Sequence, residues 1–195
     1  MKKITLTILA LIFGITLNAQ TTKWNFDNAH TKIGFSVTHM MITDVEGQFN
    51  KFNGTVTSDK PDFTDAKINF NIDVSSINTD NADRDKHLRS ADFFDVEKFP
   101  NIKFEGVSFK KTGKGKYKLS GKFTMLGVTK NVTFDAKFSG TVKDPWGNTR
   151  AGFKINGKIN RNDWGLKYNS PMDAGGVLIG NEVEIICNVE LIKEK

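Results

Sequence analysis

The sequence predicts an all-β protein: an eight-stranded antiparallel barrel with one short helical segment over its mouth. Apolar and polar residues alternate in eight segments of the chain after residue 20. This period of two is typical of strands with one face in a core and the other in water. Eight strands are enough to close a barrel that holds one small ligand, and closure leaves no exposed edge. A two-sheet sandwich has the same alternation and stays open as the alternative.

The first two strands are expected at 33–37 and 45–57. The first alternates regularly, whereas Phe49 and Phe52 in the second are three residues apart. This break in the alternation predicts a β-bulge. The remaining six strands are expected at 66–74, 102–105, 117–125, 132–138, 153–159 and 183–191.

The segment 80–95 is the one stretch expected to be helical. It is rich in helix formers, and Asp80 is a candidate N-cap. Leu88, Ala91 and Phe94 recur at helical spacing. This helical segment connects the third predicted strand to the fourth.

The connections between the predicted strands differ at the two ends of the barrel. If successive strands run up and down, one end takes the connections that carry turn signals, 58–65, 110–116 and 141–149. The opposite end takes the connections 40–44, 75–100, 126–130 and 161–181, which include the longest ones. Binding residues concentrate on long loops held by a rigid scaffold. The second end is therefore expected to be the mouth.

Residues 1–19 are predicted to be a cleavable secretory signal peptide, and residues 20–195 a single domain. Lys2 and Lys3 precede an apolar run that ends at Leu17-Asn18-Ala19, which is the layout of a signal peptide. The run is shorter than the ~17–25 residues of a membrane-spanning helix, so an uncleaved anchor is the less favoured alternative. The expected location is the periplasm or the outside of the cell, with no membrane-spanning segment in the mature chain.

The composition argues against several kinds of site. Cys187 is the only cysteine, so no disulfide can form within the chain. The net charge of +6 is modest and does not favour nucleic-acid binding. The lysine-rich segment 110–118 is typical of a solvated hairpin turn, with a transient contact to an anionic membrane surface as the alternative. The oligomeric state stays open, and a homodimer is compatible with the sequence.

The inward faces of the strands predict an apolar cavity. The chain has 16 phenylalanines, and aromatic side chains bury large apolar areas. Gly34, Gly47, Gly121 and Gly157 are expected to leave gaps between the larger side chains. The residues expected to line the cavity are Ile33, Phe35, Val37, Phe49, Ile68, Phe70, Ile72, Phe104, Phe123, Met125, Phe134, Phe138, Phe153 and Ile155. A barrel filled by its own side chains, serving as an interaction module, is the alternative.

Four polar side chains are expected at the mouth: His39, Arg84, His87 and Arg161. Arg84 and His87 share a helix face, and the planar fork of an arginine binds oxyanions such as a carboxylate or a pyrophosphate. These side chains would meet the polar head group of an amphiphile. The alternative is a structural role, with Arg84 and Asp85 paired to Asp92 or Asp95 and Arg161 paired to Asp163.

Neither a catalytic site nor a metal site is expected, and no cofactor is expected. No two of His30, His39 and His87 stand at the short spacing of paired metal ligands. The sequence has no G-x-S-x-G motif, and Cys187 alternates with apolar neighbours as a small packed group does. A hydrolase that uses His39 or His87 on a lipid is the enzymatic alternative.

Five strings in the chain carry a family resemblance. They read WNFDNAHTKIGFSVTH from Trp24, EGQFNKFNGTV from Glu46, RDKHLRSADFFDVEKFP from Arg84, LGVTKNV from Leu126 and INRNDWGL from Ile159. In this order and spacing the chain resembles the YceI-like, or polyisoprenoid-binding, family over essentially all of residues 20–195. The block 84–100 is the most specific part. Thr31 and Trp164 depart from the serine and phenylalanine that are commoner in the family.

The resemblance implies a lipocalin-like barrel that binds an isoprenoid or a similar amphiphile. The expected ligand is a polyisoprenoid, an isoprenoid quinone or a fatty-acid-like molecule. The expected function is to sequester or carry this ligand without catalysis.

If residues 1–19 are a signal peptide, the mature chain begins near Gln20. The intact mass of the protein in the periplasmic fraction of producing cells should then match residues 20–195. Recovery of a chain that still starts at Met1 would contradict this prediction.

Overall fold

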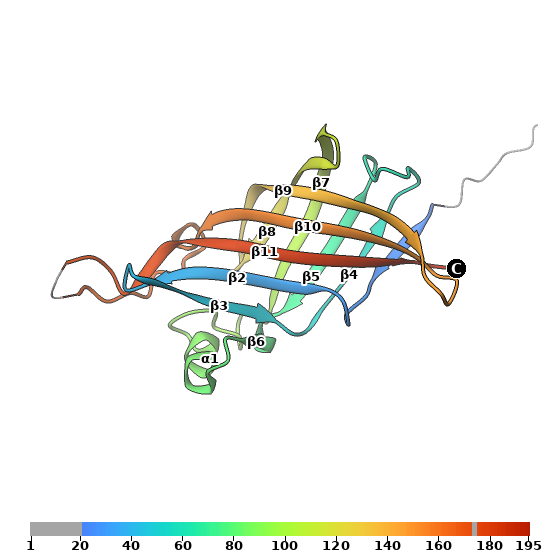
Figure 1. Ribbon diagram of the computed structural model, residues 1–195. Coiled ribbons are helices and arrows are strands. Elements are labelled where there is room, and N and C mark those ends of the chain that lie inside the picture. Colours follow the sequence, from blue (N-terminus) through green and yellow to red (C-terminus); the bar gives the residue numbers. More distant parts are fainter. Residues whose placement is uncertain (1–20, 173–174) are drawn as a thin grey trace, which may run out of the picture.

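The computed structural model describes residues 21–172 and 175–195, which form a closed antiparallel β-barrel (Figure 1). The predicted signal peptide, residues 1–19, lies outside the described residues. Six of the eight barrel positions are single strands: β5 (Lys67–Asp73), β7 (Asn101–Gly113), β8 (Lys116–Met125), β9 (Val128–Lys143), β10 (Thr149–Asn160) and β11 (Ile179–Lys193). The other two are each divided, into β1 (Lys23–Phe26) with β2 (Lys32–His39), and β3 (Thr43–Phe49) with β4 (Phe52–Thr57).

The ring of strands closes through β1, β2 and β11. β4, β5, β7, β8, β9, β10 and β11 follow one another in the sheet in this order, and each pairs antiparallel with the next. β11 then pairs with both β1 and β2, while β1 pairs with β4 and β2 with β3. A closed ring of pairings confirms the predicted eight-stranded barrel, and the two-sheet sandwich was the wrong alternative. The short strand β6 (Ile77–Asn78) adds to β3.

The second barrel position is interrupted where the sequence predicted a bulge. β3 ends at Phe49 and β4 begins at Phe52, and both side chains are buried. Between them the backbone N–H groups of Asn50 and Lys51 donate to the carbonyl oxygen and the hydroxyl of Ser76. The predicted bulge was therefore wrong: the strand is interrupted at residues 50–51, and the backbone there is hydrogen-bonded to Ser76 in the connection after β5.

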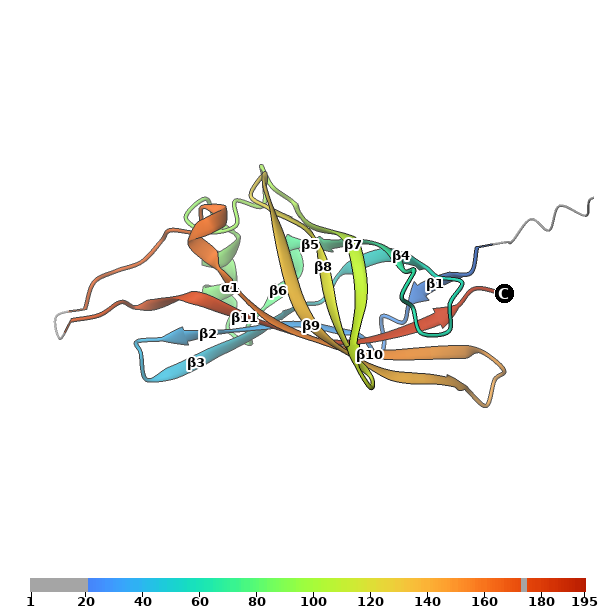
Figure 2. The ribbon, with the colours of Figure 1, turned by 90° about the horizontal axis from the view of Figure 1, so that it is seen from above.

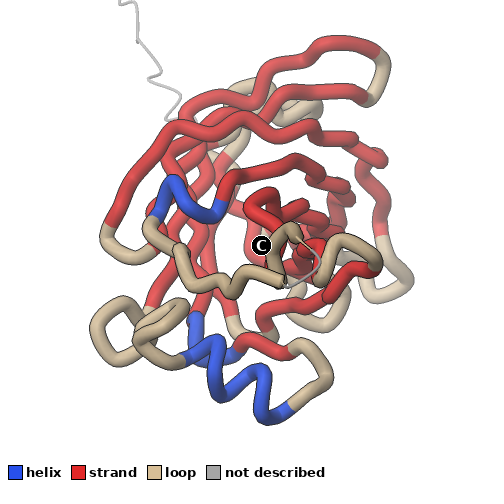
Figure 3. Tube along the Cα trace, turned by 90° about the vertical axis from the view of Figure 1, so that its left-hand side faces the viewer, coloured by secondary structure: helices blue, strands red, loops and turns tan. Residues whose placement is uncertain are grey.

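The helix is shorter than the sequence predicted. α1 spans Ala82–Arg89, and its N-cap is Asn81 rather than Asp80, since the Asn81 side chain accepts a hydrogen bond from the N–H of Arg84. The Ser90 hydroxyl donates to the carbonyl oxygen of His87 and ends the helix. α1 lies at the rim of the barrel end seen in Figure 3. In the described part of the chain, no helix has the length and apolar character needed to span a bilayer.

The end opposite the mouth is closed by aromatic side chains. Phe63, in the connection between β4 and β5, is only 2% exposed. Its ring centroid lies 5.0 Å from that of Trp24, 5.4 Å from that of Phe138 and 5.0 Å from that of Phe153. This connection shares its end of the barrel with the β7–β8 and β9–β10 turns, as the sequence predicted.

Inward-facing glycines make room for aromatic rings from neighbouring strands. A Cβ added at Gly121 would collide with the Phe104 ring and would lie 2.6 Å from the carbonyl oxygen of Glu105; at Gly157 it would collide with the Phe134 ring. The expectation of open space was therefore wrong: aromatic rings fill it at Gly47, Gly121 and Gly157, and at Gly34 an added Cβ would lie 2.9 Å from the carbonyl oxygen of Ile186. The glycines thereby let the rings lie close to the barrel wall.

We predict that Gly121→Ala destabilises the protein by about 1–3 kcal/mol, the typical cost of overpacking a core. Gly152→Ala is the matched control, because its added Cβ would meet only the Ser139 Cβ at 3.5 Å, an ordinary contact. The control should change the free energy of unfolding by no more than about 0.5 kcal/mol. Urea denaturation of both variants measures the difference, and equal values would show that the close packing at Gly121 is not needed.

Candidate ligand cavity

The barrel interior contains two adjoining apolar chambers. The inner chamber, near the closed end, has a volume of about 130 Å³ and only apolar lining surface. The outer chamber, toward the mouth, has a volume of about 310 Å³. Ile72, Ile102, Phe123 and Ile185 line both chambers and form what we call the waist. The two chambers therefore adjoin at the waist, one toward the mouth and the other toward the closed end.

Thirteen of the fourteen side chains expected to line the cavity do line a chamber. Those at the inner chamber are Ile33, Ile68, Phe70, Phe104, Phe134, Phe153 and Ile155. Those at the outer chamber are Phe35, Val37, Phe49 and Met125, while Ile72 and Phe123 belong to both. Phe138 lines neither chamber; it packs on Phe63, Tyr117 and Phe153 in the closed end. Whether the thirteen touch a ligand stays a prediction.

Several lining residues were not anticipated from the sequence. Leu119, Cys187 and Val189 lie on inward strand faces, so the alternation could have found them. Phe93 and Tyr168 reach the outer chamber from irregular connections, where no periodicity marks them. The rings of His87, Phe93 and Tyr168 form a cluster at the mouth, with centroid distances of 4.8–4.9 Å.

All four polar side chains predicted at the mouth line the outer chamber. Arg161, however, is 3% exposed, and its guanidinium donates to the carbonyl oxygens of Gly180, Leu166, Tyr168 and Ile179. Burial lowers the pKa of Arg161 from its ordinary value. The expected ion pair with Asp163 is not the contact that holds Arg161; the guanidinium instead ties the connection after β10 to the start of β11.

Arg84 is also engaged in holding the rim. Its Nε donates to the Thr79 hydroxyl at 2.7 Å, and its Nη2 donates to the Thr79 carbonyl oxygen at 2.6 Å. Asp85 accepts from the N–H and the hydroxyl of the same threonine at 2.9 and 2.6 Å. Arg84 and Asp85 thus have the structural role that was the alternative, but their partner is Thr79 and not Asp92 or Asp95. These four hydrogen bonds fix α1 against the segment that follows β6.

The two histidines at the mouth make fewer hydrogen bonds within the protein than Arg84 and Arg161 do. His87 lies 3.0 Å from Asp92 through its Nε2, and its side chain is 42% exposed. His39 ends β2, where it faces Thr43 and Ile179 across the sheet. The His39 ring makes no hydrogen bond with the residues that the structure describes. A polar group that enters the mouth would thus meet His39, His87 and the edge of Arg84.

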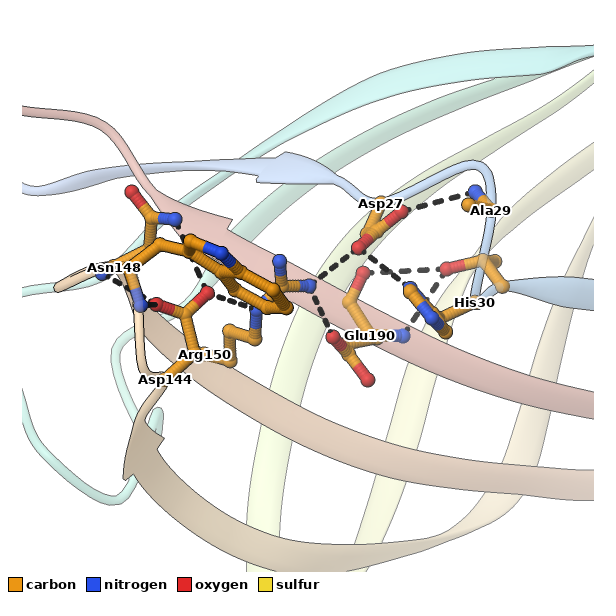
Figure 4. A network of polar contacts seen from close by, with 9 residues as sticks. Asp27, Ala29, His30, Asp144, Asn148, Arg150 and Glu190 are labelled. Atoms are coloured by element: carbon orange, nitrogen blue, oxygen red, sulfur yellow. Dashed lines mark hydrogen bonds and ion pairs between the residues drawn. The ribbon is translucent and has the colours of Figure 1, made fainter.

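A second polar cluster lies at the opposite, closed end (Figure 4). Asp27, His30 and Glu190 each offer a ligand atom within 4.8 Å of the others. Arg150 nevertheless donates to Asp27, Glu190 and Asp144 together, so a cation would have to displace this guanidinium. Burial opposes ionisation of Asp144, but hydrogen bonds from Arg150 and Asn148 outweigh it and lower its pKa to about 2. The cluster is best described as an ion-pair network joining β10, β11 and the turn after β1.

Cys187 lies in the wall of the inner chamber. Burial raises the pKa of this thiol to about 11. A thiol with a raised pKa carries little of the reactive thiolate at neutral pH. The side chain therefore contributes apolar surface to the chamber.

A closed antiparallel barrel with an apolar interior and a polar rim at one end defines the class of lipocalin-like barrels. Within this class, the model of the YceI-like domain matches residues 24–191. The chain belongs to the YceI-like family. It is 43% identical over 166 residues to a UPF0312 protein of Serratia proteamaculans, covering 85% of this chain and 83% of that protein.

Solved structures agree with this assignment. The YceI protein of Campylobacter jejuni is 30% identical, with a TM-score of 0.70 over 87% of this chain and 96% of its own. A polyisoprenoid-binding domain from Saccharophagus degradans has a TM-score of 0.65 over 88% of this chain and 98% of its own, at 13% identity. At that identity the likeness is one of fold.

We predict that Arg161→Lys lowers the free energy of unfolding by about 2 kcal/mol or more, since an ammonium cannot satisfy four buried carbonyl acceptors at once. Arg89→Lys is the control, because Arg89 makes only two long hydrogen bonds of 3.4 Å. Its effect should stay within about 0.5 kcal/mol. Denaturant titration of the two variants measures both; a mild effect at Arg161 would contradict its role as a tie.

Proposed function

We propose that this protein is an exported lipid-binding protein that sequesters or carries one long apolar amphiphile inside the barrel. The observation that supports this proposal is the arrangement of the cavity: a wholly apolar inner chamber joins an outer chamber whose polar groups lie at the rim. An isoprenoid chain in the inner chamber would leave its polar end near His39 and His87. The polyisoprenoid-binding domain of similar fold is consistent with this class of ligand.

The energetics favour a ligand recognised by its chain rather than by its head group. Burying one five-carbon prenyl unit contributes roughly 3–4 kcal/mol before losses, at about 0.8 kcal/mol per carbon group. Ordering a flexible chain offsets much of this contribution. A few units still suffice for binding in the micromolar range or better, and Arg84 and Arg161 are already engaged with the protein.

The same contacts weigh against the two alternatives. Apart from His39 and His87, the lining residues of the outer chamber with polar side chains are Thr38, Thr79, Arg84, Arg161 and Tyr168. Among the described residues, neither His39 nor His87 is hydrogen-bonded to the hydroxyl of Thr38 or Thr79, which is the contact by which a histidine base would activate a nucleophile. We therefore propose a binder and not a lipid hydrolase. The open volume of the two chambers argues against a filled barrel that serves as an interaction module.

Native mass spectrometry of the purified protein, followed by organic extraction, tests the proposal. We expect the protein to carry or take up one apolar chain per barrel, such as a prenyl alcohol or an isoprenoid quinone. Failure to bind prenyl, quinone and fatty-acid probes from detergent solution would overturn it. Release of a chemically altered product would point to the enzymatic alternative.

We predict that Ile185→Trp lowers the affinity for a fluorescent prenyl probe by about tenfold or more, because the larger ring obstructs the waist and a few prenyl units lose their burial. The control is Ile186→Trp, on the adjacent residue of β11, which lines neither chamber. The control should bind as the unmodified protein does. Equal affinities of the two variants would contradict an internal site.

A further inference from the structure

The β2–β3 hairpin carries a cluster of exposed apolar side chains at its end. Met40, Met41 and Ile42 are 42%, 63% and 83% exposed, and we call these three residues the apolar tip. The hairpin lies at the mouth end of the barrel in two perpendicular views, beside the connection between β10 and β11, which extends further (Figures 1 and 2). The backbone N–H of Met40 donates to the carbonyl oxygen of Leu178, so the connection before β11 lies alongside. Val177 on that connection is 37% exposed.

Local folding does not account for two methionines in this turn. The N–H of Ile42 donates to the carbonyl oxygen of His39, and Met40 and Met41 have φ angles of 52° and 64°. A hairpin turn with two left-handed residues favours asparagine and glycine, because other side chains are strained there. Asparagine at position 40 and glycine at position 41 would therefore form this turn with less backbone strain and would expose less apolar surface to water. The apolar tip costs both backbone strain and the exposure of apolar surface.

The apolar tip is continuous with the mouth of the cavity. Thr38 and His39, just before the tip, line the outer chamber, and so do Leu178 and Ile179, just after Val177. Tyr168, 36% exposed, also lines this chamber. Tyrosine is one of the residues that favour the interface between a bilayer and water. An apolar surface that inserts here would bring the mouth to the surface of whatever it enters.

We propose that the apolar tip inserts into a lipid bilayer, so that an apolar ligand passes between the membrane and the outer chamber without crossing water. The inference rests on the proposed lipid-binding function and names the place where the ligand is exchanged. It differs from a contact through the lysine-rich turn between β7 and β8, which lies at the closed end and would turn the mouth away from the membrane.

The size and shape of the apolar tip favour a bilayer over a second copy of the chain. The three side chains of the tip together with Val177 are 37–83% exposed and offer on the order of 400 Å², whereas a stable interface needs about 800 Å² from each partner. A narrow projection also requires a matching pocket on a protein partner. A bilayer deforms around the projection and requires no such pocket, and flexible methionine side chains adapt to irregular apolar surroundings.

The test is flotation with phosphatidylcholine vesicles, together with the rate at which a fluorescent prenyl probe moves from these vesicles to the protein. The variant is Met40→Asn with Met41→Gly, which removes apolar surface but supplies the residues that the turn favours. We expect vesicle binding and probe transfer to fall by about tenfold or more, while the unfolding midpoint stays the same or rises. Binding of the unmodified protein should withstand added salt, since the contact is apolar.

The matched control is Val142→Ser with Trp146→Ser, two side chains that are 63% and 77% exposed on the β9–β10 hairpin at the other end of the barrel. This control should bind vesicles and take up the probe as the unmodified protein does. Equal losses in both variants would overturn the proposal, because they would show only a general attraction of exposed apolar residues to lipid.

The remaining outcomes separate this inference from the proposed function. If the tip variant takes up probe from detergent solution and also from vesicles at the unmodified rate, the tip proposal fails and the lipid-binding function stands. If the unmodified protein binds no probe from either source, the proposed function itself fails. Binding only to vesicles with phosphatidylglycerol, abolished by salt, would overturn the apolar contact. A dimer that the tip variant converts to monomer would assign the tip to self-association instead.

Discussion

The structure depends on the pairing of the short strand β1 with both β4 and β11, which closes the sheet into a barrel. The chain has one cysteine and therefore no disulfide to hold its ends. Closure satisfies the backbone hydrogen bonds that an open edge would leave to solvent or to another chain. The ion-pair network around Arg150 lies beside this junction and connects the turn after β1 to β10 and β11. Everything inside the barrel follows from this closed wall.

The aromatic interior then decides how much space remains. Glycines on the inward faces let phenyl rings lie close against the wall, as at Gly121 and Gly157. Phe63 and its neighbours close one end. The result is two adjoining chambers along the barrel instead of a filled core. Their walls offer a ligand apolar surface at the closed end and polar contacts only at the rim.

At the rim, the charged side chains of Arg84, Asp85 and Arg161 are hydrogen-bonded within the protein and are therefore not free to bind a ligand. Thr79 is held by Asp85 and Arg84, and Arg161 is held by four carbonyl oxygens. A buried guanidinium without such acceptors would be strongly unfavourable. The mouth is thereby kept in shape by the same arginines that the sequence suggests as head-group ligands. Selectivity for a charged head group is correspondingly weak in the proposed function.

The sequence by itself determined the strands, the end at which the mouth lies and most of the cavity wall, whereas closure into a barrel rests on the pairing of β1 with β4 and β11. Alternation along a strand is a local property, and it assigns Phe35, Phe70 and Ile155 to the interior without any knowledge of their partners. The tertiary structure alone decided the rest, because it depends on contacts between segments distant in the chain. Phe138 lies on an inward face but packs into the closed end, since Phe63 reaches it from another connection. Arg161 holds two segments together because its guanidinium donates to the carbonyl oxygens of Leu166, Tyr168, Ile179 and Gly180. No spacing in the sequence encodes these contacts.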